Sequence, residues 1–167
     1  MKSSIVLTAL ACATGLVVGC AHKPAANSNS PEVSGKAMTF DPEGSDSGNI
    51  PGLTTVHFAF NKSNLSSEAR KILKQDAQWI EGRSNVDVQI QGNTDERGSE
   101  EYNMALGERR AKSVKHYLVG MGIASSRLST ISYGKERPLD PAHTKAAWAK
   151  NRRANLVPSE AVPTTKQ

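Results

Sequence analysis

Residues 86–120 read VDVQIQGNTDERGSEEYNMALGERRAKSVKHYLVG, and they decide the fold because they predict a strand, a loop and a helix in succession. Val86, Val88 and Ile90 alternate with polar residues, which is the pattern of a half-buried strand. A glycine-bounded loop follows. From about Glu100 onward the sequence predicts a helix whose apolar face consists of Tyr102, Leu106, Val114, Tyr117, Leu118 and Met121.

One charged side chain falls on the apolar face of this helix. At about 100° per residue, Arg110 lies near the centre of the face, whereas Arg109 points toward its edge. A guanidinium among apolar side chains is costly unless an anion pairs with it. The sequence leaves two partners open: an internal carboxylate, Asp95 or Glu96, or the carboxylate of a ligand.

Two more elements are predicted before this stretch. Apolar residues at every second position of 56–60 predict a half-buried strand that ends at Asn61. Ser66-Ser67-Glu68 is typical of a helix start, and apolar residues recur at helical spacing from there to Gly82.

Two further strands are predicted after it. Residues 126–133 and 152–157 have weaker strand patterns, and a short helical piece around residues 142–149 lies between them. The order is strand, helix, strand, helix, strand and a last strand, so both long helices can cover one face of a small mixed sheet. We therefore predict an α/β domain over residues 54–157, built as a two-layer sandwich.

The beginning of the chain predicts export and a lipid anchor. Residues 1–19 contain an early lysine, an interrupted apolar run and no acidic residue, as in a secretory signal. Val17-Val18-Gly19-Cys20 resembles the bacterial lipobox, and Cys12 would be removed with the signal, so Cys20 has no partner for a disulfide. We expect N-acyl and S-diacylglycerol lipid on Cys20. Ala21, where the inner-membrane retention signal usually has Asp, points to the outer membrane, with the domain facing the periplasm.

The segments on either side of the predicted domain have the composition of linkers. Residues 20–53 are rich in Ala, Ser, Asn, Gly and Pro and show no apolar periodicity, which predicts a flexible tether between lipid and domain. Residues 158–167 are predicted to be a disordered polar tail.

Charge and composition argue against two classes of function. The formal net charge is +5, but acidic residues are interspersed and no tract of five basic residues occurs, so we expect no nucleic-acid binding. His57, His116 and His143 lack a spacing that would bring two of them together, and no activated nucleophile is apparent. We therefore expect no enzyme, no metal and no cofactor other than the lipid.

Several motifs together resemble the OmpA-like peptidoglycan-binding domain, in order and with matching spacing, over residues 54–157. They are Val56 to Phe60, the loop Gly92-Asn93-Thr94-Asp95-Glu96-Arg97-Gly98, Tyr102-Asn103, Leu106-Gly107-Glu108-Arg109-Arg110-Ala111, Ser132-Tyr133-Gly134-Lys135 and Asn151-Arg152-Arg153. Each motif is weak alone, but the combination with a lipoprotein signal is specific. The resemblance implies a protein that grips the peptide of the cell wall without a covalent bond.

The resemblance also implies a site. Asp95 would receive the side-chain ammonium of meso-diaminopimelate, and Arg110 a carboxylate of the same residue, which a planar guanidinium can bind through two parallel hydrogen bonds. The implied pocket wall consists of Phe60, Asn61, Asn93, Thr94, Arg97, Leu106 and Asn151. The family usually has Asp at the position of Asn61, so this chain keeps a hydrogen-bonding group there but loses a charge.

Partners follow from the same resemblance. The resemblance, together with the lipoprotein signal, implies a member of the Tol envelope and cell-division system, so we expect TolB and other Tol proteins as partners, beside peptidoglycan and the outer membrane. The alternative is a wall-binding lipoprotein of another envelope system.

Overall fold

The computed structural model of the protein describes residues 39–161. The predicted signal over residues 1–19, the predicted lipid site at Cys20 and the first part of the predicted tether lie outside the described residues, as do residues 162–167. Within the described range, no helix is long and apolar enough to cross a membrane.

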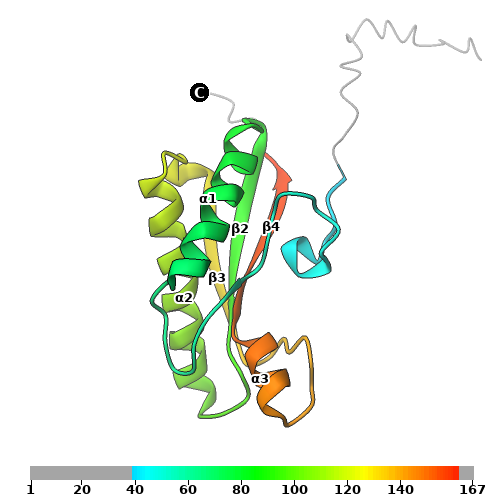
Figure 1. The fold of residues 1–167 in the computed structure, drawn as a ribbon, viewed down its shortest axis with the longest axis vertical. Helices are drawn as coiled ribbons and strands as arrows, with labels where there is room; N and C mark the ends of the chain where they lie inside the picture. Colours follow the sequence, from blue (N-terminus) through cyan, green and yellow to red (C-terminus); the bar gives the residue numbers. More distant parts are fainter. Residues whose placement is uncertain (1–38, 162–167) are drawn as a thin grey trace, which may run out of the picture. The chain divides into compact units, whose positions relative to one another are not determined.

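The described residues form an α/β domain with one four-stranded sheet, drawn in Figure 1. Its elements are η1 (Gly44–Ser47), β1 (Val56–His57), α1 (Ser67–Glu81), β2 (Val86–Asn93), α2 (Glu100–Gly120), η2 (Ser125–Arg127), β3 (Leu128–Gly134), α3 (Lys145–Asn151) and β4 (Arg153–Glu160). The strand order is β1-β4-β2-β3; β2 and β3 run parallel, whereas β4 is antiparallel to β1 and β2. The predicted mixed sheet is therefore confirmed, and α1 and α2 cover one of its faces.

Both long helices begin where the sequence predicts, because a serine caps each of them. The Ser66 hydroxyl accepts a hydrogen bond from the backbone N–H of Ala69, and the Ser99 hydroxyl accepts one from that of Tyr102. Each helix then buries one apolar face, at helical spacing, against the sheet.

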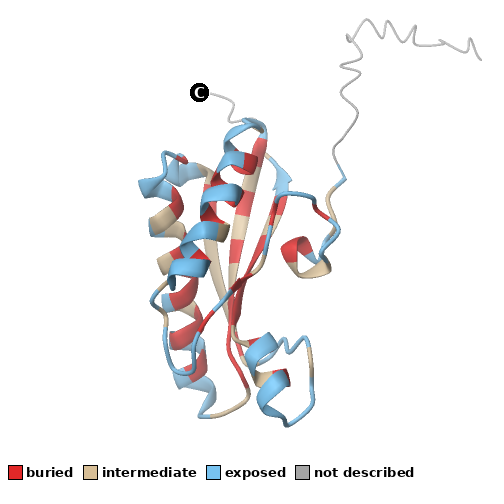
Figure 2. Cartoon of the chain, in the orientation of Figure 1, coloured by how far each residue is buried: buried red, intermediate tan, exposed pale blue. Residues whose placement is uncertain are grey.

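The strand β2 runs through the core, and its last residues bring the following loop against α2. Val86, Val88 and Ile90 are at most 1% exposed, and Figure 2 shows buried and half-buried residues alternating along β2. A Cβ on Gly92 would lie 1.9 Å from the carbonyl oxygen of Gly107, so only glycine allows this approach of strand to helix. The contact fixes the loop after β2 beside the N-terminal half of α2.

The first strand is shorter than the sequence pattern predicts. β1 ends at His57, and residues 58–62 leave the sheet; Phe60 is 57% exposed and Asn61 has a left-handed backbone with φ of 54°. Two carbonyl groups of this segment accept hydrogen bonds from the side chain of Arg110. The N–H of Phe58 still donates to the carbonyl oxygen of Arg152, but the carbonyl groups of Ala59 and Lys62 are held by a distant arginine instead of a neighbouring strand, which alternation in the sequence cannot reveal.

The last part of the predicted tether belongs to the domain, which corrects the predicted boundary at residue 54. Ile50 and Leu53 are buried in the core. The segment around η1 lies against β4, where the buried carboxylate of Asp46 is 2.8 Å from Nε of Arg153. The segment around η1 has the small and polar residues of a tether, but its polar groups are paired with buried polar groups of β4.

The other end of the domain is also longer than predicted. β4 pairs with β2 from Gly92 opposite Ala154 to Val86 opposite Glu160, so residues 158–160 of the predicted tail are strand residues. The observed β3 and α3 lie within three residues of the segments predicted for them.

Candidate functional site

A pocket with a volume of about 190 Å³ opens at the end of β2, between the following loop, the first half of α2 and the residues after β1. Its lining residues are Phe60, Asn61, Thr94, Asp95, Arg97, Gly98, Tyr102, Asn103, Leu106 and Arg110. Seven of the nine residues predicted for the pocket are among them, and Asn93 and Asn151 are not.

Arg110 is completely buried and lines this pocket. Its guanidinium donates to three backbone carbonyl oxygens: Nε to Lys62 at 2.9 Å, Nη1 to Asn93 at 2.7 Å and Nη2 to Ala59 at 3.3 Å. Among the ion pairs of residues 39–161, none joins Arg110 to a carboxylate. Of the two partners that the sequence left open, the internal salt bridge is therefore not formed in the described domain.

Arg110 nevertheless keeps its charge at neutral pH. Burial, followed by the nearby charge of Arg152, lowers the pKa of Arg110 to about 10. A guanidinium has five N–H groups, and carbonyl oxygens take one each from Nε, Nη1 and Nη2. These three bonds leave two of its N–H groups for a further acceptor.

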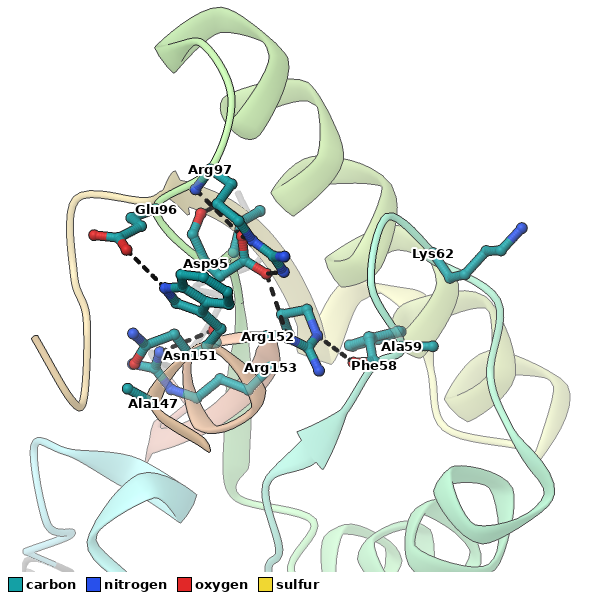
Figure 3. Close-up of polar contacts among 12 residues, drawn as sticks. Phe58, Ala59, Lys62, Asp95, Glu96, Arg97, Ala147, Asn151, Arg152 and Arg153 are labelled. Carbon is teal, nitrogen blue, oxygen red and sulfur yellow. Dashed lines mark hydrogen bonds and ion pairs between the residues drawn. The ribbon is translucent and has the colours of Figure 1, made fainter. Parts of the chain in front are cut away.

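Asp95, in contrast, is fully paired within the protein. Its Oδ1 accepts hydrogen bonds from the backbone N–H and Nε of Arg97 at 3.2 and 3.1 Å. Its Oδ2 accepts from Nη2 of Arg97 at 2.7 Å and from Nη1 of Arg152 at 3.3 Å, and Figure 3 shows both guanidiniums directed at Asp95. Burial raises the pKa of Asp95, but the bonds from Arg97 and Arg152 outweigh it and hold the pKa below its usual value. The carboxylate is therefore ionised at neutral pH.

The guanidinium of Arg97 is stacked between two aromatic rings. Its Cζ lies 4.0 Å from the centre of the Phe60 ring and 4.1 Å from the centre of the Trp148 ring, which favours cation–π attraction. Trp148 is oriented by a hydrogen bond from its indole N–H to Glu96 Oε1 at 2.6 Å. Arg97 thus forms one wall of the pocket, held by stacking as well as by charge.

Asn61 and Tyr102 form another part of the rim. The Tyr102 hydroxyl donates a hydrogen bond to Oδ1 of Asn61, and the left-handed backbone at Asn61 is one that Asn and Asp tolerate better than most residues. Tyr102 was predicted on the apolar face of its helix, but it is 43% exposed and lines the pocket instead. Leu106 is buried and supplies apolar lining.

The two predicted wall residues outside this pocket have other positions. Asn93 is buried, and its carbonyl oxygen accepts the 2.7 Å bond from Arg110, so it helps to hold that side chain. Asn151 lines a neighbouring cavity of about 200 Å³, where its Oδ1 accepts the backbone N–H groups of Leu139 and Asp140. Asn151 therefore fixes the segment before α3, because its side-chain oxygen satisfies that backbone.

Three residues not predicted for the site complete it. Asn103 Nδ2 donates to the carbonyl oxygens of Arg97 and Ser99, both at 3.0 Å, and so fixes the loop after β2. Arg152 binds Asp95, and Trp148 stacks on Arg97. Asn103 and Arg152 both belong to motifs visible in the sequence, but their directions depend on the tertiary fold.

The charges of the site favour an anionic group in the ligand. Three guanidiniums, those of Arg97, Arg110 and Arg152, lie around the single carboxylate of Asp95 or line its pocket. Hydrogen bonds from a guanidinium to a carboxylate are strong and can be bidentate. Within the described part of the chain, no group of three or more His, Cys, Asp or Glu residues could hold a metal ion.

Comparisons with known proteins concern the chain and its fold as a whole. The model of the OmpA family matches residues 57–152. The chain is 41% identical over 163 residues to the peptidoglycan-associated lipoprotein of Pseudomonas aeruginosa, covering 89% of this chain and 93% of that protein. It is 48% identical over 103 residues to the protein of that name from Pasteurella multocida, covering 62% and 69%. The crystal structure of the peptidoglycan-associated lipoprotein from Burkholderia pseudomallei is similar with a TM-score of 0.61 and 40% identity, over 63% of this chain and 89% of that one.

Proposed function

The chain belongs to the OmpA family, in which its relatives are peptidoglycan-associated lipoproteins, and on this premise we propose that it binds peptidoglycan without a covalent bond. The group it grips is meso-diaminopimelate in the stem peptide, whose free end carries an ammonium and a carboxylate on one carbon atom. The protein acts as a link in the cell envelope and performs no chemical reaction.

The unpaired charge of Arg110 is the observation that carries this proposal. The guanidinium of Arg110 is completely buried, lines the pocket and has no carboxylate partner among residues 39–161. A buried positive charge without an anion is costly, so the pocket favours a ligand that supplies one. A ligand carboxylate satisfies its remaining N–H groups. The planar geometry suits a carboxylate better than a single acceptor atom, which favours an amino-acid end group over a sugar hydroxyl.

The second charge of the ligand is matched by Asp95. Its carboxylate is ionised and lines the same pocket as Arg110, so opposite charges of the protein meet opposite charges of one zwitterionic group. Asn61 and Tyr102 add neutral hydrogen-bonding groups at the rim. Peptides that lack either charge of the end group are expected to bind more weakly.

The proposed position in the cell depends on the start of the sequence. We place a lipid on Cys20 and the anchor in the outer membrane, with the domain reaching the wall from that side. The names of the relatives as lipoproteins support the lipid. TolB and other Tol proteins are proposed partners, and recovery of TolB with the lipidated protein from its own envelope tests this; recovery of other envelope proteins without TolB would favour a system outside Tol.

Calorimetry with three synthetic peptides tests wall recognition. The first is L-Ala-D-Glu-meso-diaminopimelate; the second has L-Lys in place of diaminopimelate and so lacks the carboxylate; the third has that carboxylate amidated. A hydrogen-bonded charged group contributes about 1.5 to 3 kcal/mol, so the second and third peptides should bind roughly 10- to 100-fold more weakly. Equal affinity for all three would show that Arg110 does not recognise a carboxylate.

A further inference from the structure

Asp95 has no free acceptor position in this structure. A carboxylate offers about four lone-pair sites. Four donors occupy them: the backbone N–H, Nε and Nη2 of Arg97, and Nη1 of Arg152. The side chain of Asp95 is also only 5% exposed. An ammonium group from a ligand can therefore reach this carboxylate only if one of the donors leaves.

The guanidinium of Arg97 is the donor that can leave. The Arg152 side chain is 15% exposed, donates through Nε to the carbonyl oxygen of Phe58 at 3.0 Å and directly precedes β4. The Arg97 side chain is 35% exposed, and its stacking partner Phe60 is itself largely in solvent. To rotate outward, Arg97 gives up its bonds to Asp95 and its stacking on Phe60 and Trp148, and its side chain has no other hydrogen bond in the described domain.

The balance of charges also indicates that a cation must leave Asp95 when the ligand ammonium binds. With Arg97 in place, a ligand ammonium would enter a site where Arg97 and Arg152 already neutralise Asp95 and where Arg110 is unpaired. The ligand ammonium and these guanidiniums would all be positive, and like charges in one partly buried pocket repel each other strongly. Replacement of one cation by another leaves Asp95 paired before and after binding, so only the exchange keeps the charges matched.

Resting on the proposed function, we infer that Arg97 is an internal competitor of the ligand, whose guanidinium holds Asp95 in the free protein and is displaced by the ammonium of diaminopimelate in the complex. The exchange makes binding weaker than at an empty carboxylate, and therefore readily reversible. It also makes Arg97 a specificity-determining residue. A peptide that offers only a carboxylate binds Arg110 but leaves Asp95 with Arg97.

Arg97→Gln tests the exchange in the full chain with the diaminopimelate tripeptide as the probe. The Arg97 end of its pair with Asp95 is 35% exposed, and Arg152 still pairs with Asp95 after Arg97 is removed. The pair and the cation–π contacts are therefore each worth only a few-fold in an equilibrium constant, and Arg97→Gln should lower the Kd of the tripeptide by about 3- to 10-fold. Arg137→Gln is the matched control, because Arg137 is an exposed arginine that is also stacked on a ring, 3.6 Å from the centre of the Tyr133 ring, and it is not among the hydrogen-bond partners of Asp95. It should leave the Kd within about two-fold of the parent, since the loss of one exposed charge acts only through screened long-range attraction.

The outcomes separate the two proposals. If the parent does not bind the tripeptide, the proposed function fails, and the exchange with it. If the parent binds and Arg97→Gln binds equally or more weakly, the proposed function stands and the exchange is wrong, because Arg97 then does not compete with the ligand.

An NMR measurement follows the exchange directly. In the free protein the Nε–H of Arg97 is bonded to Asp95 and lies between two rings, so its resonance should be shifted from that of a solvent-exposed arginine. Saturation with the tripeptide should move it to the exposed position, whereas the Nε–H of Arg152, bonded to Phe58, should stay in place. An Arg97 resonance that does not move at saturation would overturn the inference.

Discussion

Arg110 is the residue on which both the fold and the proposed function depend. Its three hydrogen bonds join the segment after β1, through Ala59 and Lys62, to the end of β2 at Asn93. The same side chain lines the pocket. Substitutions at this position therefore change stability and binding together, and a useful experiment must measure both.

Arg110→Lys should lower both quantities. An ammonium is a point charge with three donors, and it cannot keep three carbonyl oxygens in place while presenting a two-pronged surface to a carboxylate. We expect a lower Tm and at least about 30-fold weaker binding of the diaminopimelate tripeptide, equivalent to roughly 2 kcal/mol. Calorimetry at a temperature where circular dichroism shows the folded protein measures this. Arg109→Lys is the control, since Arg109 is exposed on the neighbouring position of α2; parent-like binding by Arg110→Lys would contradict the carboxylate contact.

Asp76 is a second residue whose charge is buried, and it lies away from the pocket. It is fully buried on α1; Oδ1 accepts the backbone N–H of Thr54 at 2.9 Å, and Oδ2 has no hydrogen-bond partner in the described structure. Burial raises the pKa of Asp76 from 3.8 to about 7, against the opposing effect of the Thr54 bond. The folded protein therefore binds a proton that the unfolded chain releases.

Asp76→Asn should remove a pH dependence of stability. Because the folded pKa is raised, the contribution of Asp76 is fully present below about pH 4, falls as the pH rises toward 7 and is constant above it. The variant should be more stable than the parent above pH 7, by up to about 4 kcal/mol, and nearly equal to it at pH 4. Urea unfolding at pH 4, 5.5, 7 and 8 measures the difference. Parallel curves for the two proteins would show that Asp76 titrates normally.

At the scale of elements, sequence patterns succeeded where local chemistry determines the structure. β2 and both long helices lie where alternation, helical periodicity and serine caps predicted them. The buried face of each of these elements depends on residues within the element itself. The segment around η1 and the end of β1 differ from the prediction, because distant side chains hold them. Asp46 is bound by Arg153, and the backbone after β1 by Arg110.

The candidate site also has one feature that the sequence predicts and one that depends on the tertiary fold. Arg110 could be predicted as a residue in need of an anion, since its place on an apolar helix face follows from spacing alone. The pairing of Asp95 with Arg97 and Arg152 could not, because it depends on the direction of two side chains from different elements. The need of Arg110 for an anion could therefore be predicted from the sequence, whereas the pairing of Asp95 with two arginines could not.

Asp46→Ala tests whether the segment around η1 is part of the domain. The side chains of Arg153 and Asp46 are 5% and 3% exposed, so the substitution leaves a buried guanidinium without its anion. Removal of one partner from such a pair should lower the free energy of unfolding by about 3 to 5 kcal/mol. Lys150→Ala, which breaks the exposed pair of Lys150 with Asp140, is the control and should cost less than about 1 kcal/mol. Equal, small effects in urea unfolding would mean that the segment is only a tether, as composition suggested.

At the scale of the whole molecule, the earlier start of the domain shortens the proposed tether. The described structure begins at residue 39, and the segment around η1 is packed on β4, so at most residues 20–38 remain to join a lipid on Cys20 to the domain. Fully extended, they would span roughly 65 Å, against about 115 Å for the originally predicted residues 20–53. The wall must then lie within this shorter reach of the membrane for one molecule to hold both.

Cys20→Ser should separate the anchor from the wall contact. The several acyl chains proposed on Cys20 make membrane attachment long-lived, since each buried methylene contributes about 0.8 kcal/mol. Without them the protein should move to the soluble periplasmic fraction, yet sediment with isolated peptidoglycan as the parent does, because every pocket residue lies between positions 60 and 110. In the cell its retention at the wall should fall, since a second attachment raises the local concentration of the domain near its ligand. Cys12→Ser is the matched control: it lies in the predicted signal, and the protein should stay in the membrane fraction. Unchanged membrane association of Cys20→Ser in washed fractions would refute the lipid anchor while leaving the proposed peptidoglycan site intact.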